Sequence, residues 1–349
     1  HQRIGKSICQ SAAPLLTRLI IVTIMVKQKS NRRDFIKKTS VLSSGLFTMA
    51  AVKGNVWQAF KNAPAEKIID IHQHTNYADR SDESLLAHQN KMGVTHTILL
   101  PAGHPVSMGS THYGVSNGLQ AKATPNEACY QLAQKYKGSY FFGANEVPDA
   151  PGAVKEIEKY LKLGACVIAE LKFNIDCDSK EMQAIYKLAQ DYDVPVLIHF
   201  QHKMYNWGFE RLHNMLRKYK KVNFIGHAQT WWANIDKNHS NQNILYPGGK
   251  VTPGGLTDLL LTRYENVYGD LSAGSGLAAL MRDEDFTRSF LKRHQDKLIY
   301  GSDCSDIEGT GKTCTGWQAI QAIKKLSQDK NAERKIFFDN ANKIFRLKL

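Results

Sequence analysis

Four histidines and one aspartate of this 349-residue chain stand at the ends of short apolar runs. His72 and His74 form a His-x-His pair after the first run, and three later runs end at His199, His227 and Asp303. Neutral imidazole nitrogens together with a carboxylate oxygen form a borderline-soft donor set that suits a divalent, zinc-like ion. Side by side, these side chains would hold an ion able to activate a bound water molecule.

The elements that must position these residues alternate between strand and helix. Short β-branched runs are separated by longer segments of helical period. The predicted strands are Ile68–His72, Thr95–Leu100, Tyr140–Ala144, Cys166–Lys172, Pro195–His199, Asn223–His227, Asn266–Asp270 and Leu298–Ser302. Eight strands with helical crossovers in about 280 residues predict a single α/β domain, a (β/α)8 TIM barrel with an additional C-terminal helix.

In a barrel the carboxyl ends of all strands meet at one mouth. Residues two apart on a strand share a face, so His72 and His74 can aim at one point. An open doubly wound sheet is the alternative fold, but no glycine-rich phosphate fingerprint follows the first strand. The long connections 101–125 and 228–255 are expected to be loops or lids over the mouth.

A lone histidine is more often a hydrogen-bonded structural residue than a ligand. The histidines that receive this ordinary interpretation are His88, His96, His213, His239 and His294. The joint placement of the other set at the ends of four strands is what favours a metal site.

In this order of motifs the chain resembles the metal-dependent amidohydrolase superfamily, and within it the branch that includes aminocarboxymuconate-semialdehyde decarboxylase. The closing segment 339–345, Asp-Asn-Ala-Asn-Lys-Ile-Phe, is similar to that branch's C-terminal helix motif NAxxxF. The resemblance covers about residues 67–349 and implies a (β/α)8 barrel with one or two divalent ions. It implies that His72, His74, His199 and Asp303 are metal ligands and that His227 is catalytic or polarises the substrate. Zinc is the favoured ion, and manganese or iron suits the same donors.

The predicted fourth strand adds Glu170 and Lys172, which lie on one face. Glu170 could bridge two ions, Lys172 could be carboxylated, or the two could form an ion pair at the mouth. Glu170 is therefore a candidate ligand, and Lys172 is a candidate counter-charge for a substrate. Trp231 and Trp232 follow His227 and are candidate walls of the pocket, with plain loop packing as the alternative.

These residues predict a metal-dependent hydrolase of an amide, ester or lactone-like bond. Asp303 is suited to act as general base, and His227 is suited to donate to the developing oxyanion. Non-oxidative decarboxylation on the same barrel is one alternative, because the resembling branch contains decarboxylases. A non-catalytic exported barrel that binds a metal or a carbohydrate is the other.

The charge of the chain is divided unevenly. Of the net charge of +14, residues 1–67 contribute +10, from twelve Lys and Arg against two acidic residues. The paired Arg32-Arg33, followed by an uncharged stretch, resembles a twin-arginine export signal. We therefore expect an extension and signal over residues 1–66, a barrel domain over residues 67–349, and an exported, periplasmic protein.

The expected partners follow from this division of charge. They are a small-molecule substrate and, transiently, the twin-arginine export machinery; a homo-oligomer is compatible with the sequence. The domain itself shows no motif for nucleic acid.

Two cysteines, Cys304 and Cys314, flank one predicted loop. They either pair in an oxidising compartment or remain buried free thiols. The cysteines lack CxxC spacing, so the sequence contains neither a zinc ribbon nor a thioredoxin-like motif.

Overall fold

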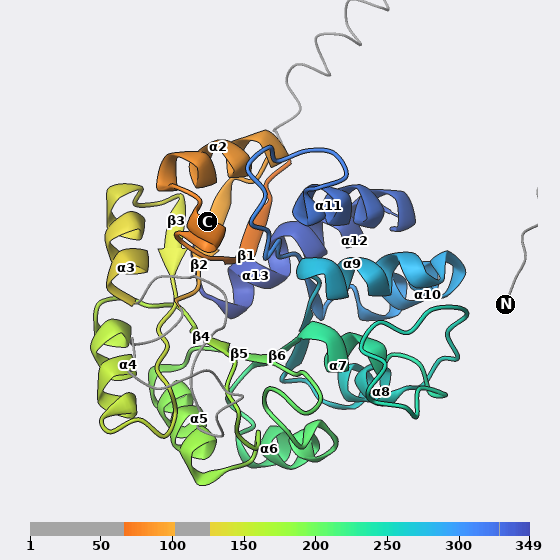
Figure 1. Cartoon of the computed structure of the whole chain (residues 1–349), viewed down its shortest axis with the longest axis horizontal. Coiled ribbons are helices and arrows are strands. Elements are labelled where there is room, and N and C mark those ends of the chain that lie inside the picture. Colours follow the sequence, from red (N-terminus) through yellow and green to blue (C-terminus); the bar gives the residue numbers. More distant parts are fainter. Residues whose placement is uncertain (1–65, 102–125, 328) are drawn as a thin grey trace, which may run out of the picture. The chain divides into compact units, whose positions relative to one another are not determined.

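A computed structural model describes residues 66–101, 126–327 and 329–349 of the chain. The predicted export segment and most of the predicted loop 101–125 lie outside the described residues. Glu66–Leu349 forms one structural unit, in which a ring of strands is surrounded by helices (Figure 1).

Eight strands alternate with helices in the described part of the chain. The strands are β1 (Ile69–Gln73), β2 (His96–Leu99), β3 (Tyr140–Phe142), β4 (Ile168–Leu171), β5 (Val196–His199), β6 (Phe224–His227), β7 (Val267–Asp270) and β8 (Leu298–Ile299). The α-helices are α2 (Asp82–Met92), α3 (Asn126–Lys135), α4 (Ala153–Lys162), α5 (Lys180–Tyr192), α6 (Leu212–Lys218), α7 (Ala228–Ala233), α8 (Leu256–Arg263), α9 (Ala273–Arg282), α10 (Glu284–His294), α11 (Thr315–Leu326), α12 (Lys330–Arg334) and α13 (Asn340–Ile344). Short turns of other helix types are η1 (Tyr77–Asp79), η3 (Phe209–Arg211) and η4 (Lys335–Asp339).

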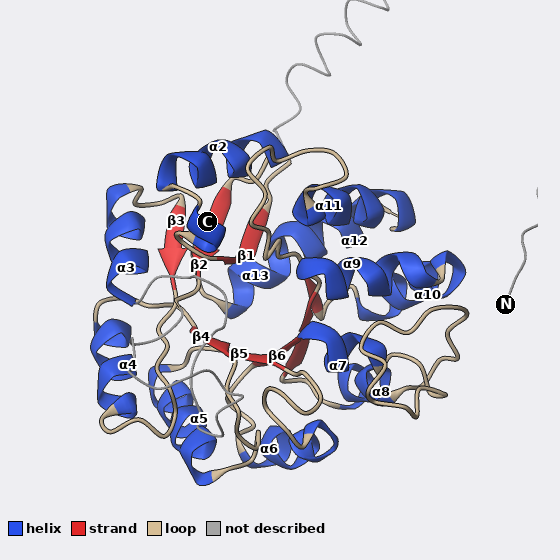
Figure 2. Cartoon of the chain, in the orientation of Figure 1, coloured by secondary structure: helices blue, strands red, loops and turns tan. Residues whose placement is uncertain are grey.

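The strands pair in parallel in the orders β1-β2-β3 and β4-β5-β6-β7-β8. Backbone hydrogen bonds join the two pieces on both sides. The amide of Ala144, just after β3, donates to Val167 O before β4 over 2.9 Å, and the amide of Ile71 in β1 donates to Tyr300 O after β8 over 3.3 Å. The sheet therefore closes into a barrel, with the helices outside it (Figure 2), and the predicted (β/α)8 fold is confirmed.

Local sequence explains where the outer helices begin. Ser81 and Ser179 precede α2 and α5, and each hydroxyl accepts a hydrogen bond from a backbone amide of the first turn. Asp283 caps α10 in the same way. These caps satisfy amides that the helix itself leaves unpaired, so helix starts are among the features that the sequence predicts well.

The C-terminal helix completes the inner core. Ala341, Ile344 and Phe345 pack in one buried cluster with inward-facing residues of the strands. The side-chain amide of Asn340 donates to Leu298 O at the start of β8 over 2.8 Å. The predicted additional helix therefore fastens the amino end of β8, away from the carboxyl ends that form the mouth.

A second, larger apolar cluster lies between the strands and the surrounding helices. The predicted 228–255 connection starts with α7 and then continues mostly as loop. Within the described residues, every helix is too short or too polar to cross a membrane.

Candidate metal centre

The barrel brings the predicted histidines to one place at the carboxyl ends of the strands. His72 lies in β1 and His74 directly after it, while His199 and His227 are the last residues of β5 and β6. His199 and His227 are paired in register across these neighbouring strands. All four imidazoles are buried, so each ring must find its partners within the protein.

Hydrogen bonds at Nδ1 fix the orientation of three of these rings. Nδ1 of His74 donates to the carbonyl oxygen of Leu100 over 2.7 Å. Nδ1 of His72 lies 2.7 Å from Asp270 Oδ2, and Nδ1 of His227 lies 3.1 Å from the same oxygen. Since carbonyl and carboxylate oxygens accept, the proton of each ring lies on Nδ1, and Nε2 presents a lone pair.

Two carboxylates face these Nε2 atoms. Oε2 of Glu170 lies 3.6 Å from Nε2 of His72 and 3.6 Å from Nε2 of His74. Asp303 Oδ1 lies 4.0 and 3.6 Å from the same two nitrogens. Nε2 of His227 is 3.7 Å from an oxygen of each carboxylate. The five groups thus surround one small space.

His199 contacts the group through Nδ1, whereas the other three histidines face it with Nε2. Its Nδ1 lies 2.6 Å from Glu170 Oε1, and its Nε2 lies 3.2 Å from Gln201 Oε1. Glu170, His199 and His227 have ligand atoms within 4.8 Å of one another. All five predicted ligands therefore belong to one cluster, which also includes His227.

The cluster passes a test for a bound cation. Nε2 of His72 and Oδ1 of Asp303 are buried and have no hydrogen-bond partner within the described part of the chain. An unsatisfied buried lone pair is costly, and both of these atoms point toward the space among the histidines. A divalent ion bound by nitrogen and carboxylate oxygen would satisfy them, so the residues present fit the ion that the sequence suggests.

Charge and burial shift the pKa values in this cluster. Burial disfavours the cationic form of His72, but without an ion Asp303 and Asp270 outweigh burial and raise its pKa well above the usual value, so a bound ion would displace a proton from Nε2 and use its lone pair. For Asp303, burial is opposed by the neighbouring His72, and the net effect lowers the carboxyl pKa. Burial, assisted by the positive charge of Lys172, lowers the pKa of His199 to about 4. His199 is therefore neutral at pH 7, as a ligand nitrogen must be.

The backbone turns sharply where the strands end. Ala228, Ala273 and Asp303 follow β6, β7 and β8, and their φ angles are 78°, 61° and 40°. Positive φ is unfavourable for residues other than glycine and often marks functional sites. At Asp303 the turn is held by its own amide, which donates to His72 O over 2.8 Å.

A polar cavity of about 520 Å³ opens beside the cluster and is lined by His199, His227 and Asp303. Lys172 also lines this cavity, with its Nζ 5.2 Å from the ring centroid of Tyr205. Glu170, by contrast, faces the histidines, so these two neighbours on the fourth strand have different partners.

The tryptophans do not occupy the position expected from the sequence. Trp231 and Trp232 are 0% and 3% exposed and belong to the core between strands and helices. The ring of Trp231 packs against Gly226 in β6, and Nε1 of Trp232 donates to Asp270 O over 2.9 Å. The prediction that they wall the pocket is therefore wrong, because helix α7 turns them toward the sheet. A carbohydrate in the non-catalytic alternative would therefore find neither of these two rings at the pocket.

Asp270 is the functional residue that sequence reasoning missed. It is the last residue of β7 and is fully buried. Burial raises the pKa of its carboxyl group, but His227 and His72 outweigh this effect and lower it. The sequence does carry a signal for Asp270, because it ends the predicted strand 266–270 just as His199 and His227 end theirs.

Comparison with solved structures agrees with the fold. A TIM-barrel protein of Bordetella bronchiseptica is 13% identical, with a TM-score of 0.57 over 80% of this chain and 99% of the other. The 2,6-dihydroxybenzoate decarboxylase from Rhizobium is 12% identical, with a TM-score of 0.52 over 81% and 100%. The 5-carboxyvanillate decarboxylase LigW from Sphingomonas paucimobilis is 14% identical, with a TM-score of 0.50 over 80% and 99%.

No curated protein matches the chain. The sequence profile of the amidohydrolase family, however, matches residues 69–347, from the first strand to the last residues of the chain. This match covers the whole barrel and every residue of the cluster described above. The chain therefore belongs to the amidohydrolase family.

Proposed function

We propose that this protein is a metal-dependent hydrolase that cleaves an amide, ester or lactone-like bond in a small molecule. One observation carries the proposal. Buried lone pairs on His72 Nε2 and Asp303 Oδ1 lack partners and point into one space beside a polar cavity. Buried polar atoms without a hydrogen-bond partner are costly to keep. A bound cation would satisfy both of these atoms at once.

His72, His74, His199 and Asp303 would hold the ion, with Glu170 as a further ligand. When bound, the ion supplies a Lewis acid that lowers the pKa of water and polarises a substrate oxygen. Zinc suits the nitrogen-rich donor set best, and manganese or iron suits it as well.

Asp303 is placed to take a proton from the attacking water. Its lowered pKa keeps it ionised at neutral pH, and it lines the cavity. After the attack, the same carboxyl group can pass that proton to the leaving group. His227 also lines the cavity, 3.7 Å from Asp303 Oδ2, and when its ring carries a proton on Nε2 as well as on Nδ1 it can donate to the substrate oxygen on which negative charge develops.

Lys172 suggests the charge of the substrate. Among the described residues that line the cavity, it is the sole lysine or arginine. An ammonium group at the edge of a polar cavity favours a substrate that carries a carboxylate.

Decarboxylation is the second candidate, and a specific observation favours it. Two of the solved structures with a similar fold are decarboxylases of hydroxylated benzoates. In that reaction the carbon that loses carbon dioxide would take a proton that comes from water and passes through Asp303, and no oxygen of water would enter the product.

Isotope labelling separates the two reactions. The purified protein is incubated in ¹⁸O-labelled water with panels of lactones, esters, amides and aromatic carboxylates. Hydrolysis predicts one labelled oxygen in the acid product and no carbon dioxide, while release of carbon dioxide without labelling of the product would replace hydrolysis by decarboxylation. Activity that survives both His227→Ala and Asp303→Ala would contradict either assignment.

We further propose that the protein is exported to the periplasm through the twin-arginine pathway. The support is the Arg32-Arg33 pair and the concentration of positive charge before residue 68. Mass spectrometry of the native protein should find a mature N-terminus between about residues 50 and 66. Intact residues 25–50 on that protein would disprove export by this signal.

A further inference from the structure

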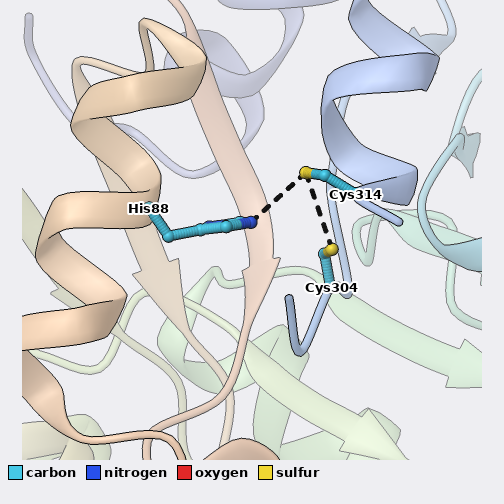
Figure 3. A group of neighbouring side chains, drawn as sticks. All are labelled: His88, Cys304 and Cys314. Carbon is cyan, nitrogen blue, oxygen red and sulfur yellow. Dashed lines mark hydrogen bonds between the residues drawn. The ribbon is translucent and has the colours of Figure 1, made fainter. Parts of the chain in front are cut away.

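A second group of potential metal ligands lies beside the barrel mouth, where one of them, Cys304, also lines the polar cavity. His88 comes from α2, Cys304 from the loop after β8, and Cys314 from the N-cap of α11 (Figure 3). These side chains approach each other from three separate segments, and the residues are 0%, 3% and 0% exposed. Their ligand atoms all lie within 4.8 Å of one another.

The separations match those of ligands around a tetrahedral ion. The two sulfurs are 3.8 Å apart, and Sγ of Cys314 lies 3.3 Å from Nε2 of His88. With Zn–S bonds of about 2.3 Å and Zn–N bonds of about 2.0 Å, tetrahedral angles put two sulfurs about 3.8 Å apart and sulfur and nitrogen about 3.5 Å apart. A disulfide would need the sulfurs about 2.0 Å apart, and both cysteines are free thiols here.

The other ring nitrogen of His88, Nδ1, has a hydrogen-bond partner of the kind that orients a metal-bound histidine. Nδ1 of His88 lies 3.2 Å from the side-chain oxygen of Gln89. That oxygen accepts the ring proton, because the amide nitrogen of Gln89 donates to Asp70 and to Thr97. Nε2 of His88 is therefore left with a lone pair toward the sulfurs, and the orienting contact is of the kind that metal-bound histidines make.

Cys314 shares with Cys304 a hydrogen bond that lowers the pKa of the Cys304 thiol and raises its own. It caps α11, and its sulfur accepts a hydrogen bond from the amide of Trp317 over 3.3 Å. Amides at the start of a twelve-residue helix favour negative charge. Sδ of Met92 lies 3.6 Å from Cys314 Sγ.

We propose that His88, Cys304 and Cys314 form a second metal site, selective for a thiophilic ion of the zinc class. Binding of Zn²⁺ displaces one proton from each thiol to solvent. Two thiolates then balance the charge of the ion, and such a neutral group suits a buried place better than an isolated charge. The site differs from the nitrogen and carboxylate cluster at the mouth in its donors and in its residues.

The site would fasten the loop that carries Asp303. The carbonyl oxygen of Cys304, the next residue, accepts hydrogen bonds from Gln73 Nε2 over 2.9 Å and from Arg80 Nη1 over 2.8 Å. Gln73 itself stands between His72 and His74. An ion held by Cys304 and Cys314 would thus tie both ends of the 304–314 loop to α2, beside the segment that carries the His-x-His pair.

Cobalt substitution tests this site without reference to activity. The full chain, purified under reducing conditions, is stripped with a chelator and titrated anaerobically with Co²⁺. Cobalt bound by sulfur gives an intense near-ultraviolet charge-transfer band that the nitrogen and carboxylate site cannot give. We expect the band to stop growing once this site is full, which takes one cobalt per chain beyond those that the cluster at the mouth binds, and to disappear when Zn²⁺ is added in excess.

Variants assign the band to these residues. We expect its loss in the double variant Cys304→Ser/Cys314→Ser, a change of its visible bands in His88→Asn, and no change in Cys166→Ala. Cys166 is the matched control because its thiol contacts the backbone oxygen of Phe142. Should the double variant fail to fold, the wild-type titration and His88→Asn still decide.

Two results would overturn the proposal. One is the absence of a sulfur-to-cobalt band in the reduced wild-type protein. The other is a disulfide between Cys304 and Cys314 in protein isolated without reductant, found by mass spectrometry of an unreduced digest, because a disulfide excludes the ion.

Discussion

Asp270 Oδ2 lies 2.7 Å from Nδ1 of His72, although 198 residues separate the two in the chain. The same oxygen lies 3.1 Å from Nδ1 of His227. One carboxylate at the end of β7 thus orients two imidazoles and turns their Nε2 atoms toward Glu170 and Asp303. The metal cluster therefore depends on a residue that need not touch the ion.

Replacing Asp270 by Asn is expected to weaken metal binding while the protein stays folded. The amide cannot accept from both rings as a carboxylate does, and loss of an orienting partner typically costs 10- to 100-fold in metal affinity. Competition with a chromogenic chelator measures the change. Asp296→Asn, at an exposed aspartate paired with Lys335, is the control and should bind metal as the wild type does. Equal affinity in both variants would show that Asp270 does not orient the ligands.

Lys172 is expected to recognise a substrate carboxylate. Lys172→Met should raise KM for an anionic substrate about tenfold or more and change kcat little. The reason is that the contact stabilises the bound substrate and the transition state equally. Lys180→Met is the matched control, since that side chain is 92% exposed. Steady-state kinetics with a substrate and its neutral amide or ester analogue test the assignment. A KM that rises equally for the charged and the neutral compound would contradict it.

Gly226 is expected to tolerate no side chain. A Cβ atom there would lie 2.2 Å from the ring of Trp231, which is buried and cannot withdraw. Overpacking of this kind costs about 1–3 kcal/mol, so Gly226→Ala should lower the free energy of unfolding by that amount in urea. Gly248→Ala is the control, because its Cβ would meet no atom within 4 Å. A Gly226→Ala protein as stable as the control would show that the Trp231 ring can move.

Asp258 is expected to make stability depend on acid pH. Burial raises the pKa of this carboxyl group, but hydrogen bonds from His294, Gly254 and Arg293 outweigh burial and lower it to about 2. The unfolded chain has a pKa of about 3.9 there. The folded state therefore gains stability from Asp258 above about pH 4 and loses it as the pH falls through about 2.

Asp258→Asn should accordingly be less stable than the wild type at pH 7, by about 2 kcal/mol. The difference between the two proteins should shrink as the pH falls from about 4 toward 2. Urea unfolding at several pH values measures this difference. Asp285→Asn, at an aspartate that is 88% exposed, should show no such trend. A constant difference from pH 7 to pH 2 would disprove the contribution.

The barrel itself was largely predictable from the sequence. Each predicted strand is present, with ends shifted by at most three residues, because β-branched runs and helical spacing are local patterns that burial reinforces. Helices α2 and α5 begin directly after Ser81 and Ser179, and such caps are local features that a sequence records. Ends of strands are less sharply marked, since pairing with neighbours decides them.

The sequence by itself determined the kind of chemistry, because histidines and an aspartate at the carboxyl ends of strands meet at one mouth when the sheet closes into a barrel. The tertiary structure alone decided which nitrogen of each ring faces the centre, because Asp270 and Leu100 reach those rings from distant strands. It also turned Trp231 into the core and brought His88, expected to be an ordinary histidine, against Cys314 across 226 residues. Contacts between residues so far apart depend on how the elements pack, and no local spacing records them.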